Sequence, residues 1–139
     1  AQIRSGATRL RLGSIHPTRD FNYVTDTVAG FIAAMDGNVP SGTVVNVGSN
    51  FEISIGDTAN LIAEIMGADI AIESDEQRVR PALSEVERLW ASNERARQIL
   101  HWQPEYGGQD GFRRGLEKTI AWFNASAEQA VQKPDSYNI

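Results

Sequence analysis

The stretch RDFNYVTD, residues 19–26, decides how the rest of the sequence is interpreted. Residues 21–24 within it form a short run of strand-forming type. Apolar residues then recur at positions 28, 31, 32 and 35, and this spacing predicts one face of a helix. Asp26 falls where it would cap that helix, or lie in its first turn and complement the positive end of its dipole. The stretch therefore predicts a strand that leads directly into a helix.

Arg19 stands immediately before this strand. An arginine just before a strand that is followed directly by a helix can bind an anion, because its guanidinium and the positive end of the helix dipole can face the same charge. The alternative is an arginine on the surface that pairs with the neighbouring Asp20. On spacing alone the surface ion pair is the favoured interpretation.

The composition excludes several classes of protein. With 139 residues, 41% hydrophobic and 22% charged, the chain is typical of one soluble globular domain. No apolar run is long enough to span a membrane, and the first residues lack the pattern of a signal peptide. The absence of cysteine suits a cytoplasmic protein. A net charge of −5 argues against a nucleic-acid partner or an anionic membrane surface.

The rest of the chain alternates short apolar runs with helical patterns. Strands are expected at residues 10–13, 44–47, 70–72 and 86–90, and further helices at residues 55–66, 93–100 and 109–127. Ser54 and Asp57 have the spacing of a capping box for the first of these helices. The order predicts an α/β fold with short strands and four or five helices. Residues 1–127 are expected to form the domain and residues 128–139 a polar C-terminal tail.

Four motifs in this order resemble a known family. They are RDFNYVTD at 19–26, VNVG at 45–48, the pair Arg80-Pro81, and LHWQP at 100–104. Together they closely resemble the C-terminal part of the NAD-dependent epimerase/dehydratase family, the extended short-chain dehydrogenases/reductases that act on nucleotide sugars. The segments at 14–26, 48–57 and 84–89 look most like nucleotide-sugar 4,6-dehydratases, nearest to those of nonulosonic (legionaminic) acid pathways. The implied fold is the C-terminal portion of the family fold, lacking most of the Rossmann sheet.

The resemblance implies a substrate-binding site. Arg19 matches the family arginine that contacts the diphosphate of the nucleotide sugar, and Asn46 matches an asparagine at a strand end beside it. Arg80 matches a second arginine on the diphosphate, and Glu85 falls where some members contact the ribose. Two guanidinium groups would neutralise much of the charge of a pyrophosphate.

Two of these residues have simpler interpretations. Arg80 can be a solvated loop charge near Glu76 or Asp75. Asn46 can be a turn or bulge residue that bonds local backbone.

The sequence also departs from the family. It contains neither G-x-x-G-x-x-G nor G-x-G-x-x-G, the glycine-rich motifs that bind NAD. None of its tyrosines has a lysine four residues later, the pair that moves the proton in the family. We therefore expect no NAD cofactor, no catalytic residue and no metal site in this chain, although NAD belongs to the full-length family. His16 and His101 have neither triad nor metal-ligand spacing. His101 replaces a family glycine, and we expect it to adopt the left-handed conformation of a helix C-cap.

Three hypotheses for function follow. In the first, the chain is the substrate-binding portion of a 4,6-dehydratase and is inactive alone. In the second, it is a free-standing module that binds nucleoside diphosphates, or half of a split enzyme that a separate dinucleotide-binding chain completes. In the third, it is a structural protein with a vestigial site. The base and the sugar are not readable from the residues.

We also expect a homo-oligomer, most simply a two-fold dimer. The apolar strand at 44–47 and the helices after residues 26 and 54 would lack the partners that they have in the family. The alternative is a monomer whose loops cover that strand.

Overall fold

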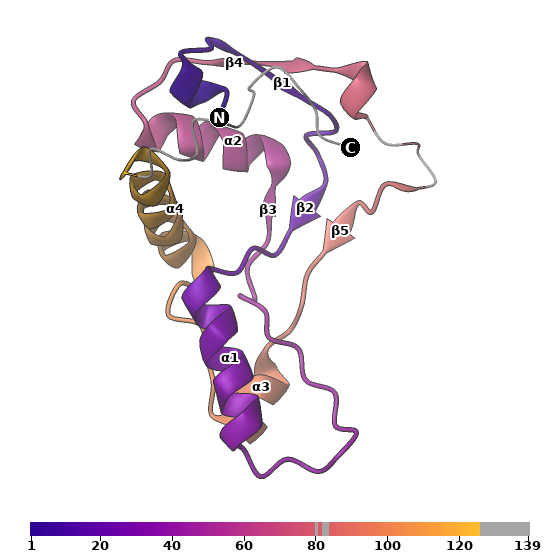
Figure 1. Cartoon of the computed structure of the whole chain (residues 1–139). Helices are drawn as coiled ribbons and strands as arrows, with labels where there is room; N and C mark the ends of the chain where they lie inside the picture. The colour runs from indigo at the N-terminus through magenta and orange to yellow at the C-terminus, as the bar shows by residue number, and fades with distance from the viewer. Residues whose placement is uncertain (80, 82–83, 126–139) are drawn as a thin grey trace. The chain divides into compact units, whose positions relative to one another are not determined.

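The computed structural model describes residues 1–79, 81 and 84–125 (Figure 1). The chain divides into two compact units. The first unit contains Ala1–Pro17, Ser54–Glu87 and the described chain from Leu116 onward. The second unit contains Thr18–Ile53 and Arg88–Gly115. The predicted tail, residues 128–139, lies outside the described residues, and the division into a domain and a tail stays a prediction.

The first unit is built on one pair of parallel strands. Strand β1 (Arg9–Leu12) pairs with β4 (Ala71–Ser74), with Leu10 opposite Ile72. Helix α2 (Ile55–Ile65) belongs to this unit, and two short 3-10 helices flank the strands, η1 (Ile3–Ser5) and η2 (Glu76–Arg78). The predicted capping box is confirmed, because the Ser54 hydroxyl oxygen accepts the N–H of Asp57 at 2.9 Å.

The second unit carries a strand pair and two helices. Strand β2 (Thr18–Arg19) pairs in parallel with β5 (Arg88–Leu89), and β3 (Ile53–Ser54), at the boundary of the units, completes the sheet order β3-β2-β5. Helices α1 (Val24–Asp36) and α3 (Glu94–Leu100) follow β2 and β5. Helix α4 (Gly108–Ala125) begins in this unit and continues into the first. The described residues thus form an α/β fold with four α-helices, as predicted.

The core of the second unit surrounds one tryptophan. Trp102 packs with Ala96 and Leu100 of α3, and partly buried residues complete the cluster: Ala33, Val39, Val45 and Val47. His101, between two of the core residues, has φ 53° and ψ 28° and caps α3 in the left-handed conformation. The expectation for His101 is therefore confirmed.

The predicted strand at residues 21–24 is wrong in position. The strand lies earlier, at Thr18–Arg19, and α1 already begins at Val24. The aromatic residues between the strand and the helix pack against other rings and do not pair with a neighbouring strand. The ring centres of Phe21 and Phe112 are 5.6 Å apart, and those of Tyr23 and Tyr106 are 4.5 Å apart.

The predicted strand at residues 44–47 is also wrong, since this segment belongs to neither sheet. Side chains meet two of its carbonyl groups: Arg95 donates to the carbonyl of Val44 at 3.0 Å, and Asn22 donates to that of Val47 at 2.7 Å. An apolar run alone does not make a strand, because a strand also needs a neighbour for its backbone.

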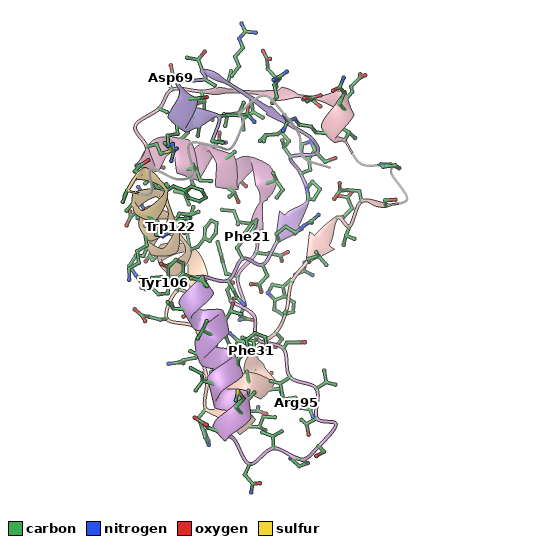
Figure 2. The ribbon with its side chains drawn as sticks, viewed as in Figure 1. Phe21, Phe31, Asp69, Arg95, Tyr106 and Trp122 are labelled. Atoms are coloured by element: carbon green, nitrogen blue, oxygen red, sulfur yellow. The ribbon has the colours of Figure 1, made fainter. Side chains whose placement is uncertain are left out.

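Helix α1 has two different faces. Its buried residues are Asp26 and Gly30, and a Cβ at Gly30 would lie 2.5 Å from a methyl group of Val47, so only glycine permits this approach. The larger apolar residues stay exposed, with Phe31 at 67% and Met35 at 84% of their surface. Figure 2 labels Phe31 on this helix. Val28 and Ile32 are exposed as well. Helix α1 therefore contacts its own unit through small residues and leaves an apolar face uncovered.

Asp26 lies in the first turn of α1, as one of the two predicted alternatives has it. Its carboxylate, only 4% exposed, accepts the backbone N–H groups of Glu105 and Tyr106 at 3.0 and 2.9 Å. The residue thus joins α1 to the segment that leads into α4. No helix among the described residues is long and apolar enough to cross a membrane.

Candidate functional site

Arg19 occupies the end of β2, opposite Leu89 of β5. The strand pair continues one residue further, because the N–H of Asp20 donates to the carbonyl of Leu89 at 2.8 Å. The Arg19 side chain is half-buried, and its Nη1 donates to the carbonyl of Thr18 at 2.8 Å. Thr18 and Asp20, the residues on either side of Arg19, are therefore both held against β5.

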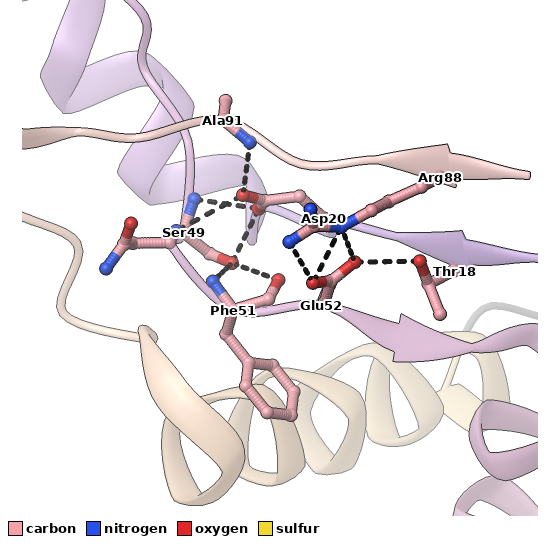
Figure 3. Close-up of polar contacts among 8 residues, drawn as sticks. Thr18, Asp20, Ser49, Phe51, Glu52, Arg88 and Ala91 are labelled. Carbon is pink, nitrogen blue, oxygen red and sulfur yellow. Dashed lines mark hydrogen bonds and ion pairs between the residues drawn. The ribbon is translucent and has the colours of Figure 1, made fainter.

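Asp20 binds a loop of residues 48–52, which we call the 49-loop (Figure 3). Its Oδ1 accepts the N–H and the hydroxyl of Ser49, at 2.8 and 2.6 Å. Its Oδ2 accepts the N–H of Asn50 at 3.2 Å and that of Ala91 at 3.3 Å. One carboxylate thus joins β2 to two other segments of the second unit.

Glu52 closes the 49-loop with an ion pair to Arg88 of β5. The Nε and Nη2 atoms of Arg88 donate to the carboxylate at 2.8 and 2.5 Å, and the Thr18 hydroxyl donates to it at 2.8 Å (Figure 3). These donors lower the pKa of Glu52, with Arg88 the largest cause, and Glu52 in turn raises the pKa of Arg88. The guanidinium of Arg88 also lies 5.4 Å from the ring centre of Trp90, at cation–π range.

Two asparagine side chains bind the first residue of the 49-loop and the residue before it. Asn22 donates to the carbonyl of Val47, and Asn93 donates to that of Gly48 at 3.1 Å. Residues 18–22 therefore run antiparallel to residues 47–52, with Thr18 beside Glu52 at one end and Asn22 beside Val47 at the other. Side chains make most of these bonds in place of a backbone ladder.

The predicted site residues fall in different parts of the structure. Arg19 and Asn46 both belong to the second unit, near opposite ends of this antiparallel pair, and Asn46 is exposed. Glu85 is a half-buried residue of the first unit. Arg80 lies outside the described residues. Asp75, one of the proposed neighbours of Arg80, accepts a bond from Arg78 at 3.0 Å. The structure therefore brings two of the four into one unit.

The sequence reasoning missed the residues that surround Arg19. Asp20 was considered only as an ion-pair partner, and Ser49, Glu52 and Arg88 were given no individual role. Glu52 and Arg88 are 36 positions apart, so no local spacing could have paired them. Gly48-Ser49-Asn50 was the available signal, since small and polar residues after an apolar run are typical of a loop that bonds through its backbone. No group of three or more metal-ligating side chains exists among the described residues.

The spaced glycines at the start of α4 lie outside the strand–turn–helix setting of a dinucleotide loop. The glycines that come nearest to a cofactor loop, Gly108 and Gly111, open α4 after a turn and do not follow a strand. A Cβ at Gly111 would lie 2.3 Å from the backbone carbon of Tyr106. Glycine at this position therefore permits the close approach of α4 to the backbone of Tyr106.

Known proteins resemble this chain over most of its length. A family model described as GDP-mannose 4,6 dehydratase matches residues 1–115. A UDP-glucose 4-epimerase of Mycolicibacterium smegmatis is 32% identical over 127 residues, which are 91% of this chain and 37% of that protein. UDP-glucuronic acid decarboxylase 1 of Xenopus tropicalis is 33% identical over 133 residues, 88% of this chain and 28% of that protein.

The fold has relatives among solved structures as well. The crystal structure of UDP-glucose 4-epimerase from Thermotoga maritima with UDP-glucose matches with a TM-score of 0.73 at 22% identity, over 88% of this chain and 37% of that one. The chain therefore spans less than two-fifths of the length of each of these three proteins. With the family model matched over 115 of its residues, the chain belongs to the NAD-dependent epimerase/dehydratase family and corresponds to the C-terminal part of its members.

Proposed function

We propose that this chain is the substrate-binding part of a nucleotide-sugar 4,6-dehydratase, and that Arg19 binds the diphosphate of the nucleotide sugar. The observation that carries the proposal is the position of Arg19, whose neighbours on both sides are fixed by hydrogen bonds to the 49-loop. The guanidinium of an arginine can form bidentate, charge-assisted bonds to phosphate oxygens. Relatives named for their action on UDP- and GDP-linked sugars support this class of ligand.

The remaining site residues complete the proposal. Arg80 would supply the second positive charge on the diphosphate, Asn46 a polar contact beside it, and Glu85 a contact to the ribose. The 4,6-dehydratase activity rests on the family model and on the segments at 14–26, 48–57 and 84–89, and nonulosonic acid pathways are the metabolic setting that we propose. The absence of cysteine favours the cytoplasm.

Catalysis would belong to a different part of the enzyme. The sequence has no glycine-rich NAD motif and no tyrosine followed four residues later by lysine. We therefore expect the 139-residue chain alone to bind no NAD and to form no 4-keto-6-deoxy product. A stoichiometric NAD complex, measured by fluorescence quenching, would contradict this. The dinucleotide half would be supplied by the same polypeptide or by another chain, which co-purification would detect.

Calorimetric titration with UDP, GDP, CDP and dTDP tests the proposed binding. We expect weak affinity, with Kd about 0.1–1 mM, because the dinucleotide half also contributes contacts. Arg19→Ala should weaken binding roughly tenfold, since one charge-assisted bond contributes about 1.5 kcal/mol or more. The matched control is Arg95→Ala, which removes an arginine of the same unit that bonds the carbonyl of Val44. Equal affinities of wild type and Arg19→Ala would remove Arg19 from the site, and no binding of any nucleotide would leave only a structural role.

We further propose that the chain self-associates as a two-fold dimer through α1 and the segment at 44–47. The supporting observation is the uncovered apolar face of α1, together with Val44, which is 74% exposed. Several such side chains at roughly 25 cal/mol per Å² give a driving force of several kcal/mol. A dinucleotide-binding chain is the competing occupant of this surface.

A further inference from the structure

The two residues that flank Arg19 both bind the 49-loop through their side chains. The Thr18 hydroxyl donates to Glu52, and the Asp20 carboxylate accepts the N–H and the hydroxyl of Ser49. Side chains of an extended segment alternate between its two faces. Thr18 and Asp20 therefore share one face of the segment, on which they bind the 49-loop, and the side chain of Arg19 belongs to the opposite face.

The backbone of the 49-loop is shaped to receive Asp20. The successive N–H groups of Ser49 and Asn50 converge on the carboxylate at 2.8 and 3.2 Å, and Asn50 has φ 60°. Successive N–H groups at a left-handed residue form a concavity that binds anions. In this protein the concavity is filled by the carboxylate of Asp20, so the loop and β2 fix each other.

Both flanks of Arg19 are also joined to the chain around β5. On one side, Thr18 reaches Arg88 through the carboxylate of Glu52. On the other side, Asp20 accepts the N–H of Ala91, just beyond β5. A rotation of the backbone at Arg19 would break bonds at both ends of this arrangement. The direction of the Arg19 side chain is therefore set by its neighbours.

We infer that Thr18 and Asp20 are positioning residues for an anion site at Arg19. They hold the backbone of Arg19 so that its side chain leaves the strand on the face opposite to theirs, with Nη1 within reach of the Thr18 carbonyl at 2.8 Å. Neither residue touches the anion in this scheme. A guanidinium whose backbone is already ordered loses less conformational entropy on binding, and this gain appears as affinity. The inference rests on the proposed binding of a diphosphate by Arg19.

The test is a set of NMR titrations of the 139-residue chain with inorganic pyrophosphate and with UDP. Asp20→Asn places an amide donor against backbone N–H groups, and we expect it to weaken binding about fivefold. Thr18→Val removes one of the two connections and should weaken binding about twofold to threefold. In the Arg19→Ala background, Asp20→Asn should cause no further loss. A purely structural role of Asp20 would give the same factor in both backgrounds.

Asp26→Asn is the matched control. Asp26 is another carboxylate of the second unit that accepts two backbone N–H groups, and the proposed site does not use it. The affinity of the Asp26→Asn variant for pyrophosphate should equal that of the wild type.

The outcomes separate the inference from the function beneath it. If Arg19→Ala weakens binding and Asp20→Asn does not, the positioning role is wrong and the diphosphate site stands. If Arg19→Ala has no effect, the site and the inference fail together. If the amide spectrum shows that Asp20→Asn does not fold, Thr18→Val decides, and wild-type affinity of that variant overturns the inference.

Discussion

The 49-loop and the segment at 44–47 are consecutive in the chain, but their backbones are satisfied in different ways. In the loop, the N–H groups of Ser49, Asn50 and Phe51 all donate to side-chain oxygens of the second unit. In the preceding segment, the side chains of Arg95 and Asn22 donate to the carbonyl groups of Val44 and Val47, and Val44 stays largely exposed. The comparison teaches that the backbone of a polar loop can be bonded within its unit while the apolar run beside it keeps a large side chain, Val44, exposed.

The largest expected effect concerns the apolar side of this comparison. We expect wild-type protein at ~100 μM to be a dimer, because the apolar area on α1 and residues 44–47 supplies several kcal/mol. Val44→Asp or Phe31→Asp, at side chains that are 74% and 67% exposed, should give a monomer in light scattering coupled to size exclusion.

Trp122→Ser is the control for these variants. Trp122 is a large exposed side chain of the first unit and lies on a different helix, α4, so its removal should leave the mass unchanged. A wild-type monomer, or a dimer that survives the charged substitutions, would contradict the proposal.

The polar side of the comparison is tested by Asp20→Ala. This change removes the acceptor of four hydrogen bonds and leaves the N–H groups of Ser49, Asn50 and Ala91 without it. We expect a loss of about 2–3 kcal/mol in the free energy of unfolding, since unsatisfied polar groups cost about 1–3 kcal/mol each when buried and less when water reaches them. Urea denaturation measures it. For comparison, Asp57→Ala at the α2 cap should cost about 1 kcal/mol or less, and an equal loss in both variants would refute the special role of Asp20.

His101→Gly probes the core beneath the apolar segment. His101 holds φ 53° at the end of α3, against which Val45 and Val47 pack. Glycine adopts this conformation without strain, so the variant should be more stable by roughly 1 kcal/mol. Thermal unfolding followed by circular dichroism measures the gain. His101→Val, a β-branched residue, should do the opposite, and a stabilising valine would disprove the strain argument.

The smallest expected effect is a pH dependence from the ion pair at the end of the 49-loop. The pKa of Glu52 is lowered from its ordinary value of 4.5, so the unfolded state binds this proton more readily than the folded state. The contribution is therefore present above pH 4.5 and is lost as the pH falls through the lowered pKa. Carbon-detected NMR titration of the Glu52 carboxyl group should give a value below 4.5, and Arg88→Met should return it toward 4.5. A Glu52 pKa at or above the ordinary value would contradict the expected direction.

Features that depend on neighbours in the sequence were predictable. Ser54 and Asp57 are three positions apart, and the capping box that their spacing predicts is present. His101 follows the last residue of α3, and its left-handed conformation is found. A capping box is decided within one helical turn, so the spacing of its two residues is enough to locate it, whereas the expectation for His101 came from the family glycine that it replaces.

Features that depend on distant partners were not predictable. Asp20 and Ser49 are 29 positions apart, and Asp20 resembles any acidic residue beside an arginine. The aromatic run at 21–24 was assigned to a strand by composition, but Phe21 and Tyr23 pack on rings near residues 106–112. The assignment of Arg19 to the diphosphate came from the family resemblance, and the positions of its neighbours came from the structure.

The buried contact of Asp26 with Glu105 and Tyr106 also constrains how the protein folds during synthesis. The partners are 79 and 80 positions apart, and the second unit is itself composed of two separate stretches, Thr18–Ile53 and Arg88–Gly115. A ribosome adding roughly 5–20 residues per second releases the first stretch several seconds before the second. During that interval the carboxylate of Asp26 lacks both of these partners, and the 49-loop has only part of its own. The nascent chain therefore depends on the late arrival of residues 88–115, and a pause in translation between the two stretches would lengthen the exposure of α1.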